Sequence, residues 1–110
     1  MDGLISSGNK RTYTDFKKQI PKNIIPLFDT LREFCLSLGE KTIEDVRMHR
    51  VVFCKSFTFR WFADMEPQKD HIIIKIQKNR KESVIINEIS LESDITNIKK
   101  TIQNAYESIH

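Results

Sequence analysis

Glycine, histidine and cysteine are scarce in this chain, which holds three, three and two of them among its 110 residues. Two of the glycines, Gly3 and Gly8, lie close to the N-terminus, so the sequence contains no glycine-rich loop to hold a phosphate group. Cys35 and Cys54 are too few and too far apart for a disulfide framework or a CxxC motif. Each lies within an apolar run, and we therefore expect two buried, reduced thiols in a cytoplasmic protein.

Long hydrophobic runs are also missing. No stretch approaches the roughly 20 apolar residues of a membrane-spanning helix, so we expect no membrane segment. Residues 1–20 lack the basic start, apolar core and small-residue cleavage site of a secretory signal. The composition, with 39% hydrophobic and 30% charged residues, is that of an ordinary globular protein, and the length suits a single domain.

The net charge of +3 is distributed unevenly along the chain. Residues 1–45 carry seven basic and seven acidic side chains, which balance. Residues 46–81 carry nine basic side chains against Asp64, Glu66 and Asp70, a net charge of +6. Residues 82–110 carry two lysines and five acidic residues, a net charge of −3. An anion-binding surface is therefore expected in the middle third of the chain, if there is one.

The N-terminal part of the chain differs in character from the rest. Residues 1–21 are polar and have no sustained periodicity, which predicts a flexible arm with a short ordered piece around Tyr13–Ile20. A single α+β domain is expected over residues 22–110. Its first helix begins near Pro21 and Pro26 and ends at Gly39. The apolar residues of this helix recur at spacings of three and four, namely Ile24, Leu27, Phe28, Leu31, Phe34, Cys35 and Leu38.

After this helix the hydrophobic period becomes that of strands. Segments rich in Val, Ile, Phe and Trp predict strands at 43–47, 50–55, 57–63, 71–78 and 84–90. The turn from Glu66 to Asp70 should join two of them in a hairpin, and Ser93 or Asp94 should cap a closing helix. We predict an α+β two-layer sandwich: an N-terminal helix, an antiparallel sheet of four to five strands, and a C-terminal helix, with both helices on one face.

The residue types that catalysis requires do not gather in the sequence. His49 is the histidine best placed to act as a base, but a histidine in a surface turn is the simpler interpretation of its position. No HExxH, CxxC or DxDxDG pattern is present, and Glu44 and Asp45, as neighbours in a strand, point to opposite faces. We therefore expect a non-catalytic protein without a metal ion or a cofactor.

Basic and aromatic residues alternate from Lys55 to Phe62, and no acidic residue lies between Val46 and Ala63 to neutralise the basic ones. Aromatic side chains can stack on bases while Lys and Arg bind phosphates. The sequence therefore predicts a binding module that takes nucleic acid or another polyanion on a basic sheet face. The expected phosphate contacts are Arg47, Arg50, Lys55, Arg60 and Lys75, and the expected stacking residues are Trp61 and Phe62.

The direction in which the strand at 57–63 faces decides the character of this surface. An aromatic row is more often core than binding surface, so Phe57, Phe59 and Trp61 are expected under the helices, with Thr58, Arg60 and Phe62 on the open face. The reverse register would instead expose the first three. On the neighbouring strand we expect Ile72, Ile74 and Ile76 to be buried, with Ile73, Lys75 and Gln77 outside.

The same face also suits a second function. An open face with apolar residues such as Val52, Phe62 and Ile73 could serve protein–protein association, as a homodimer contact or a contact with a neighbouring domain.

With its elements in this order, the chain resembles the family labelled domain of unknown function 5655, whose members are also labelled predicted transport proteins. The resemblance spans about Ile24 to Ile109. It rests on the leading helix Leu27–Arg32, the strand segment Lys55–Phe62, the apolar strand after Pro67 and the closing helix Ile98–Glu107. It implies a helix–sheet–helix domain, often attached to longer proteins, and no established activity.

Overall fold

The computed structural model describes residues 11–56, 60–79 and 81–109. Within these residues the chain forms three helices and five strands. In chain order they are α1 (Tyr13–Lys17), α2 (Ile25–Ser37), β1 (Ile43–Val46), β2 (Val51–Cys54), β3 (Trp61–Pro67), β4 (His71–Ile76), β5 (Ile85–Ser90) and α3 (Thr96–Ser108). Each predicted strand is present, but β3 covers 61–67 where 57–63 was expected.

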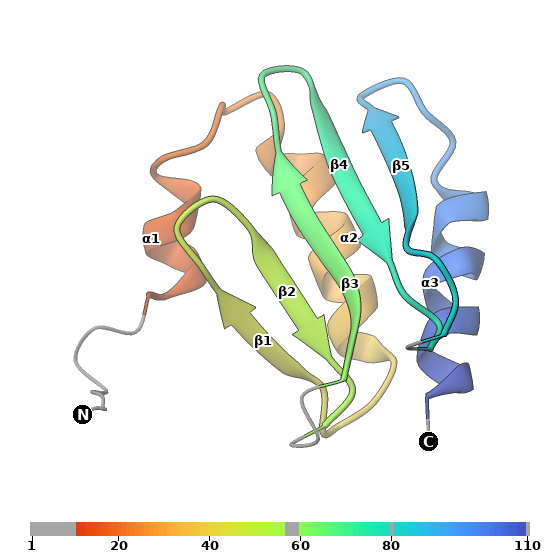
Figure 1. Cartoon of the computed structure of the whole chain (residues 1–110). Helices are drawn as coiled ribbons and strands as arrows, with labels where there is room; N and C mark the ends of the chain where they lie inside the picture. Colours follow the sequence, from red (N-terminus) through yellow and green to blue (C-terminus); the bar gives the residue numbers. More distant parts are fainter. Residues whose placement is uncertain (1–10, 57–59, 80, 110) are drawn as a thin grey trace.

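The five strands form one antiparallel sheet in which each strand pairs with the next along the chain. The predicted hairpin joins β3 and β4, and its turn is closed by the Gln68 N–H, which donates to the His71 carbonyl at 2.7 Å. Figure 1 shows α2 and α3 together on one face of the sheet, with the other face open toward the viewer. The predicted α+β two-layer sandwich is confirmed.

The hydrophobic core lies between the sheet and the helices. Ile72, Ile74 and Ile76 alternate along β4 and are fully buried, as their spacing predicts. The helices bury the residues of the two predicted apolar stripes, among them Phe28, Leu31, Cys35, Ile98, Ile102 and Ala105. The N-cap residue of α3 is Ile95, which makes no side-chain capping bond. The predicted cap Asp94 lies one residue earlier, and its carboxylate accepts the N–H of Thr96 at 2.9 Å.

The segment before α2 belongs to the folded domain. The short ordered piece expected around Tyr13–Ile20 is present as α1, which is capped by the Thr12 hydroxyl. Tyr13 and Phe16 of α1 are buried and stack near Phe28 of α2, with ring centroids 6.0 and 5.6 Å from it. The expectation that residues up to 21 form an arm outside the domain is therefore wrong for α1, because two aromatic side chains anchor it to the core.

An irregularity in the pairing of β2 with β3 sets which side chains face the helices. Phe53 pairs with Ala63, but the next residue, Cys54, pairs with Trp61, so the register skips Phe62. Phe62 and Ala63 are consequently both buried in the core although they are neighbours. Trp61 falls on the open face, beside Val52 and Asp64.

Both cysteines are free and buried, as predicted. Burial raises the pKa of the Cys35 thiol to about 12, which keeps it protonated and unreactive at neutral pH. Burial also raises the pKa of Cys54. In the described part of the chain, no helix has the length and apolar character needed to cross a membrane.

Candidate functional site

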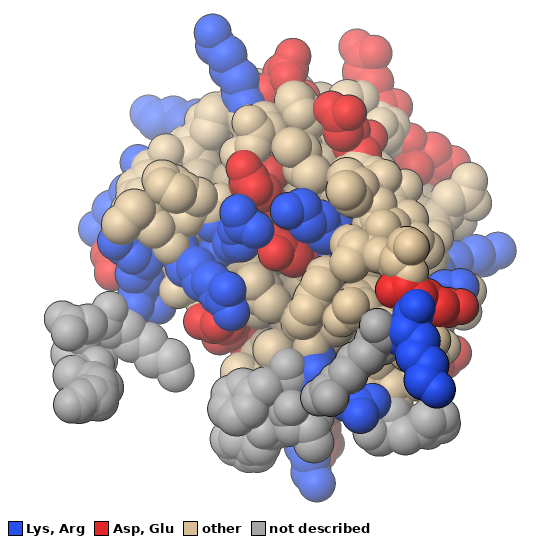
Figure 2. Space-filling model, viewed as in Figure 1, with Lys and Arg blue, Asp and Glu red and all other residues tan. Residues whose placement is uncertain are grey.

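The open face of the sheet carries charges of both signs. The register places Asp45, Val52, Asp64, Lys75 and Ile86 in one row across the five strands. The next row includes Glu66, Ile73 and Glu88 on β3, β4 and β5. Figure 2 shows Lys and Arg side chains intermingled with Asp and Glu over this face, and an uncharged area beside them. The expected basic face is therefore a mixed one.

The two arginines of the β1–β2 turn are ion-paired. The Arg47 Nε lies 3.0 Å from Oδ2 of Asp45. Arg50 contacts two acids of β3, with its Nη1 3.3 Å from Asp64 and its Nη2 3.4 Å from Glu66. Asp45 lies two residues before Arg47 in the chain, whereas the pairing of β2 with β3 brings Asp64 and Glu66 alongside Arg50. A phosphate group would compete with these carboxylates for the arginines.

Lys55 binds the C-terminal end of α3. Its ammonium group donates to the carbonyl oxygen of Tyr106 at 2.8 Å and also to that of Ile109, at the C-terminal end of α3. It further lies 4.5 Å from the centre of the Tyr106 ring. Carbonyls at the end of a helix lack intrahelical donors, so this lysine satisfies them and fastens α3 to the sheet. Lys55 was predicted to contact phosphates, and its position favours a structural role instead.

Arg60 and Lys75 are the remaining basic residues of the predicted set. Neither forms an ion pair with any residue that the structure describes, and both are partly exposed. Lys75 lies on the open face opposite Asp64 of the neighbouring strand. Phe57, Thr58 and Phe59, whose direction was part of the sequence prediction, lie outside the described residues.

The two expected stacking residues lie on opposite sides of the sheet. Phe62 is fully buried and packs edge to face against Tyr106 of α3, with ring centroids 5.3 Å apart. The prediction that it lies on the open face is wrong, because the irregularity in β3 reverses the expected register. Trp61 is the aromatic residue of the pair that reaches the open face, where it is half-buried.

Three of the predicted residues line one shallow groove on the open face. The groove has a volume of about 460 Å³ and is lined by Arg47, Val52, Trp61, Asp64, Lys75, Val84 and Ile86. Asp64, at 9% exposure, is the one buried charged residue among those described. Its Oδ2 meets Arg50, whereas its buried Oδ1 has no hydrogen-bond partner among the described residues.

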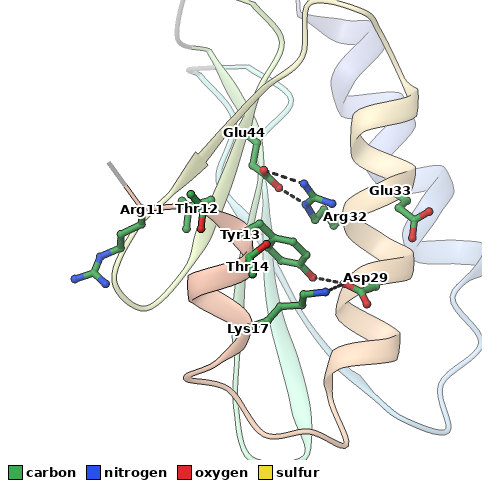
Figure 3. Close-up of a pocket in the computed structure, with 10 residues that line it drawn as sticks. Arg11, Thr12, Tyr13, Thr14, Lys17, Asp29, Arg32, Glu33 and Glu44 are labelled. Carbon is green, nitrogen blue, oxygen red and sulfur yellow. Dashed lines mark hydrogen bonds and ion pairs between the residues drawn. The ribbon is translucent and has the colours of Figure 1, made fainter. Parts of the chain in front are cut away.

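A second, more polar pocket of about 550 Å³ lies where α1 approaches α2 and β1 (Figure 3). The Tyr13 hydroxyl donates to Oδ1 of Asp29 at 2.6 Å, and Lys17 lies 3.6 Å from the same oxygen. Arg32 donates to both carboxylate oxygens of Glu44, and its guanidinium lies 4.0 Å from the centre of the Tyr13 ring. These groups bind one another, so the cluster ties α1 to α2 and β1.

The buried Tyr13 hydroxyl should make the free energy of unfolding depend on pH. Burial, reinforced by the hydrogen bond to Asp29, raises the pKa of Tyr13 well above its usual value. A raised pKa stabilises the fold below the unfolded-state value of about 10 and progressively less above it, since only the unfolded chain then releases the proton. Unfolding free energy should therefore fall more steeply above about pH 10 in the wild type than in Tyr13→Phe. Urea titrations of both proteins across that range measure this, and parallel curves would contradict it.

Among the described residues, no group of three or more His, Cys, Asp or Glu side chains could hold a metal ion. Glu44 is engaged by Arg32 on the helix side of the sheet, whereas Asp45 pairs with Arg47 on the open side, as the alternation of a strand requires. His49 is exposed in the β1–β2 turn.

Two features of these sites do not follow from the sequence patterns. In the charge distribution along the chain, Asp64 is only a compensating acid. Its place within the apolar run from Trp61 to Met65 is the one sequence signal of a buried charge. The cluster of Tyr13, Asp29, Arg32 and Glu44 joins three separated segments, and no local pattern indicates it.

The fold and its open groove define a small α+β domain with a helix-covered antiparallel meander. The chain belongs to the family described as domain of unknown function 5655, whose model matches residues 13–109 and so includes α1. No curated protein matches the chain, and no solved structure matches it.

Proposed function

We propose that this domain is a protein-association module whose contact surface is the open sheet face around Trp61. The observation that carries the proposal is the composition of the groove, in which Trp61, Val52, Val84 and Ile86 surround the buried carboxylate of Asp64. Tryptophan in a partly desolvated pocket is the residue type that most often dominates a protein interface. A neutral, largely apolar partner group fits best, because Lys75 and Arg47 at the rim disfavour a cation and Asp64 disfavours an anion.

The polyanion hypothesis has less support. Arg47 and Arg50 are ion-paired, Lys55 holds the end of α3, and Phe62 is buried. Arg60, Lys75 and Trp61 are left for a nucleic acid. A surface with so many acids among its bases lacks the uniform positive potential that drives binding to phosphates.

One experiment separates the two functions. Gel shifts with single- and double-stranded oligonucleotides at two salt concentrations should show no retardation by the wild-type protein. Retardation that falls steeply with salt, and that disappears in Lys75→Glu, would instead establish polyanion binding.

Protein association is tested by capture on the immobilised domain. A bound protein should be retained equally at both salt concentrations and lost with Trp61→Ser. Met48→Lys is the matched control, because Met48 is an exposed apolar residue, at 54%, in the β1–β2 turn outside the groove. Capture that ignores Trp61→Ser would refute the groove as the contact surface.

A further inference from the structure

The two edges of the sheet are built differently. The β1 edge is a short strand of four residues with two charged side chains, Glu44 and Asp45, each held in an ion pair. Short length and charge are the usual protection of an edge strand against pairing with another chain. The β5 edge has six residues and one charged side chain, Glu88. Three consecutive apolar side chains are exposed there: Val84, just before the strand, at 36%, and Ile85 and Ile86, within it, at 39% and 63%. This edge is therefore longer and less charged than β1.

The backbone groups that β5 presents outward follow from the hydrogen bonds of the neighbouring hairpin. Gln68 donates to His71, and Gln77 donates to Phe62, so the odd-numbered residues of β4 direct their N–H and C=O groups toward β3. The even-numbered residues Ile72, Ile74 and Ile76 must then bond to their partners on β5, which are Ile89, Asn87 and Ile85. The N–H and C=O groups of Ile86 and Glu88 consequently point away from the sheet.

The far end of this edge is closed. Ser90 belongs to the same outward-facing set, and its N–H donates to the Ser93 hydroxyl while its carbonyl accepts from the Ser93 N–H. This turn blocks an added strand beyond Glu88. The edge available for pairing is therefore the stretch Val84–Glu88, with Ile86 at its centre.

We propose that a second copy of this chain pairs with this stretch, antiparallel and related by a two-fold axis at Ile86, to make a continuous sheet of two copies. The inference goes beyond the proposed function, because the β5 edge is a second contact surface beside the groove, with which it shares Val84 and Ile86. In this register Ile86 pairs with Ile86 of the second copy, and Val84 pairs with the second copy's Glu88. Ile86 and Glu88 present the outward backbone groups that an antiparallel ladder needs, and Val84, just before β5, would extend the ladder by one residue.

The side chains favour a second copy as the occupant. The two-fold brings the exposed apolar stretch, with Ile86 at 63% exposure, onto itself, which is the self-complementarity of a symmetric interface. It also places each Glu88 opposite a valine and keeps the two glutamates apart, so no like charges face each other across the ladder. A strand of different sequence would lack both the pairing of Ile86 with itself and the pairing of Glu88 with a valine.

Sedimentation over a wide range of protein concentration tests the inference. The wild type and Met48→Lys should dimerise with the same dissociation constant at low and high salt. Ile86→Lys should raise that constant about a hundredfold, because the substitution enters the symmetric interface twice at about tenfold each. Ile86 is exposed, so circular dichroism should show that this variant keeps its fold.

Amide hydrogen exchange locates the contact. The amides of Ile86 and Glu88 should become protected as the wild-type concentration rises, while those of Glu44 and Val46 on the other edge stay unchanged. A monomer at every concentration, or a dimer without protection at Ile86 and Glu88, overturns the inference. Either result leaves the proposed function open to its own test, because capture through Trp61 does not require the β5 edge.

Discussion

Phe62→Ala should lower the free energy of unfolding by about 3–5 kcal/mol, the usual cost of removing a buried phenylalanine ring. Phe62 is fully buried and packs against Tyr106, so its loss opens a cavity between β3 and α3. A domain of this size is stabilised by about 5–15 kcal/mol in total, so this single substitution would remove a large share of the stability. Chemical denaturation monitored by circular dichroism measures the change.

Trp61→Ala is the matched comparison, since the two residues are adjacent and both aromatic. Trp61 lies half-buried on the open face, so its replacement should cost about 1–2 kcal/mol from the smaller area returned to water. If Trp61→Ala proved the more damaging of the two, β3 would have the opposite register. The proposed groove would then be wrong as well.

Gly39→Ala should destabilise the domain by about 1–3 kcal/mol through overpacking. A Cβ at this position would overlap the phenol oxygen of Tyr106 and lie 3.0 Å from its Cζ. The Tyr106 ring has little freedom to retreat, because it packs against Phe62 on one side and Lys55 on the other. Gly39 therefore allows the close approach of α3 to the end of α2.

The pair Gly39 and Tyr106 can be tested as a double-mutant cycle. Tyr106→Phe removes the oxygen that the new methyl group would overlap, and Gly39→Ala should therefore cost less in that background than in the wild type. The Cζ contact remains, so the rescue should be partial. Equal costs in both backgrounds would show that the two residues do not meet.

The element order and the layers could be predicted because each depends on local patterns. The stripe of α2 and the alternation of Ile72, Ile74 and Ile76 are repeated signals that the core enforces along a whole element. One skipped residue in β3 reverses the side of Trp61 and Phe62, and nothing in the alternating aromatic sequence marks where that skip falls.

The electrostatic character of the open face could not be predicted for a different reason. The sequence shows Arg50 in a stretch without acids, yet Asp64 and Glu66 of the adjacent strand neutralise it. Ion pairs across strands depend on the register of two segments at once, which composition along the chain does not contain. The packing of α1 on the core through Tyr13 is likewise a tertiary contact. The polar sequence around Tyr13 gave no sign of it.

The sheet order, which repeats the chain order from β1 to β5, bears on how the protein acquires its structure during synthesis. Each strand can pair with the strand synthesised just before it. Every pairing therefore closes only a short loop, at a small cost in conformational entropy, and rapid folding is expected. α3 is different, since its docking joins Lys55 to Ile109 across half of the polypeptide. It should be the final piece to settle, and a nascent chain paused before it would present its isoleucine-rich sheet to chaperones.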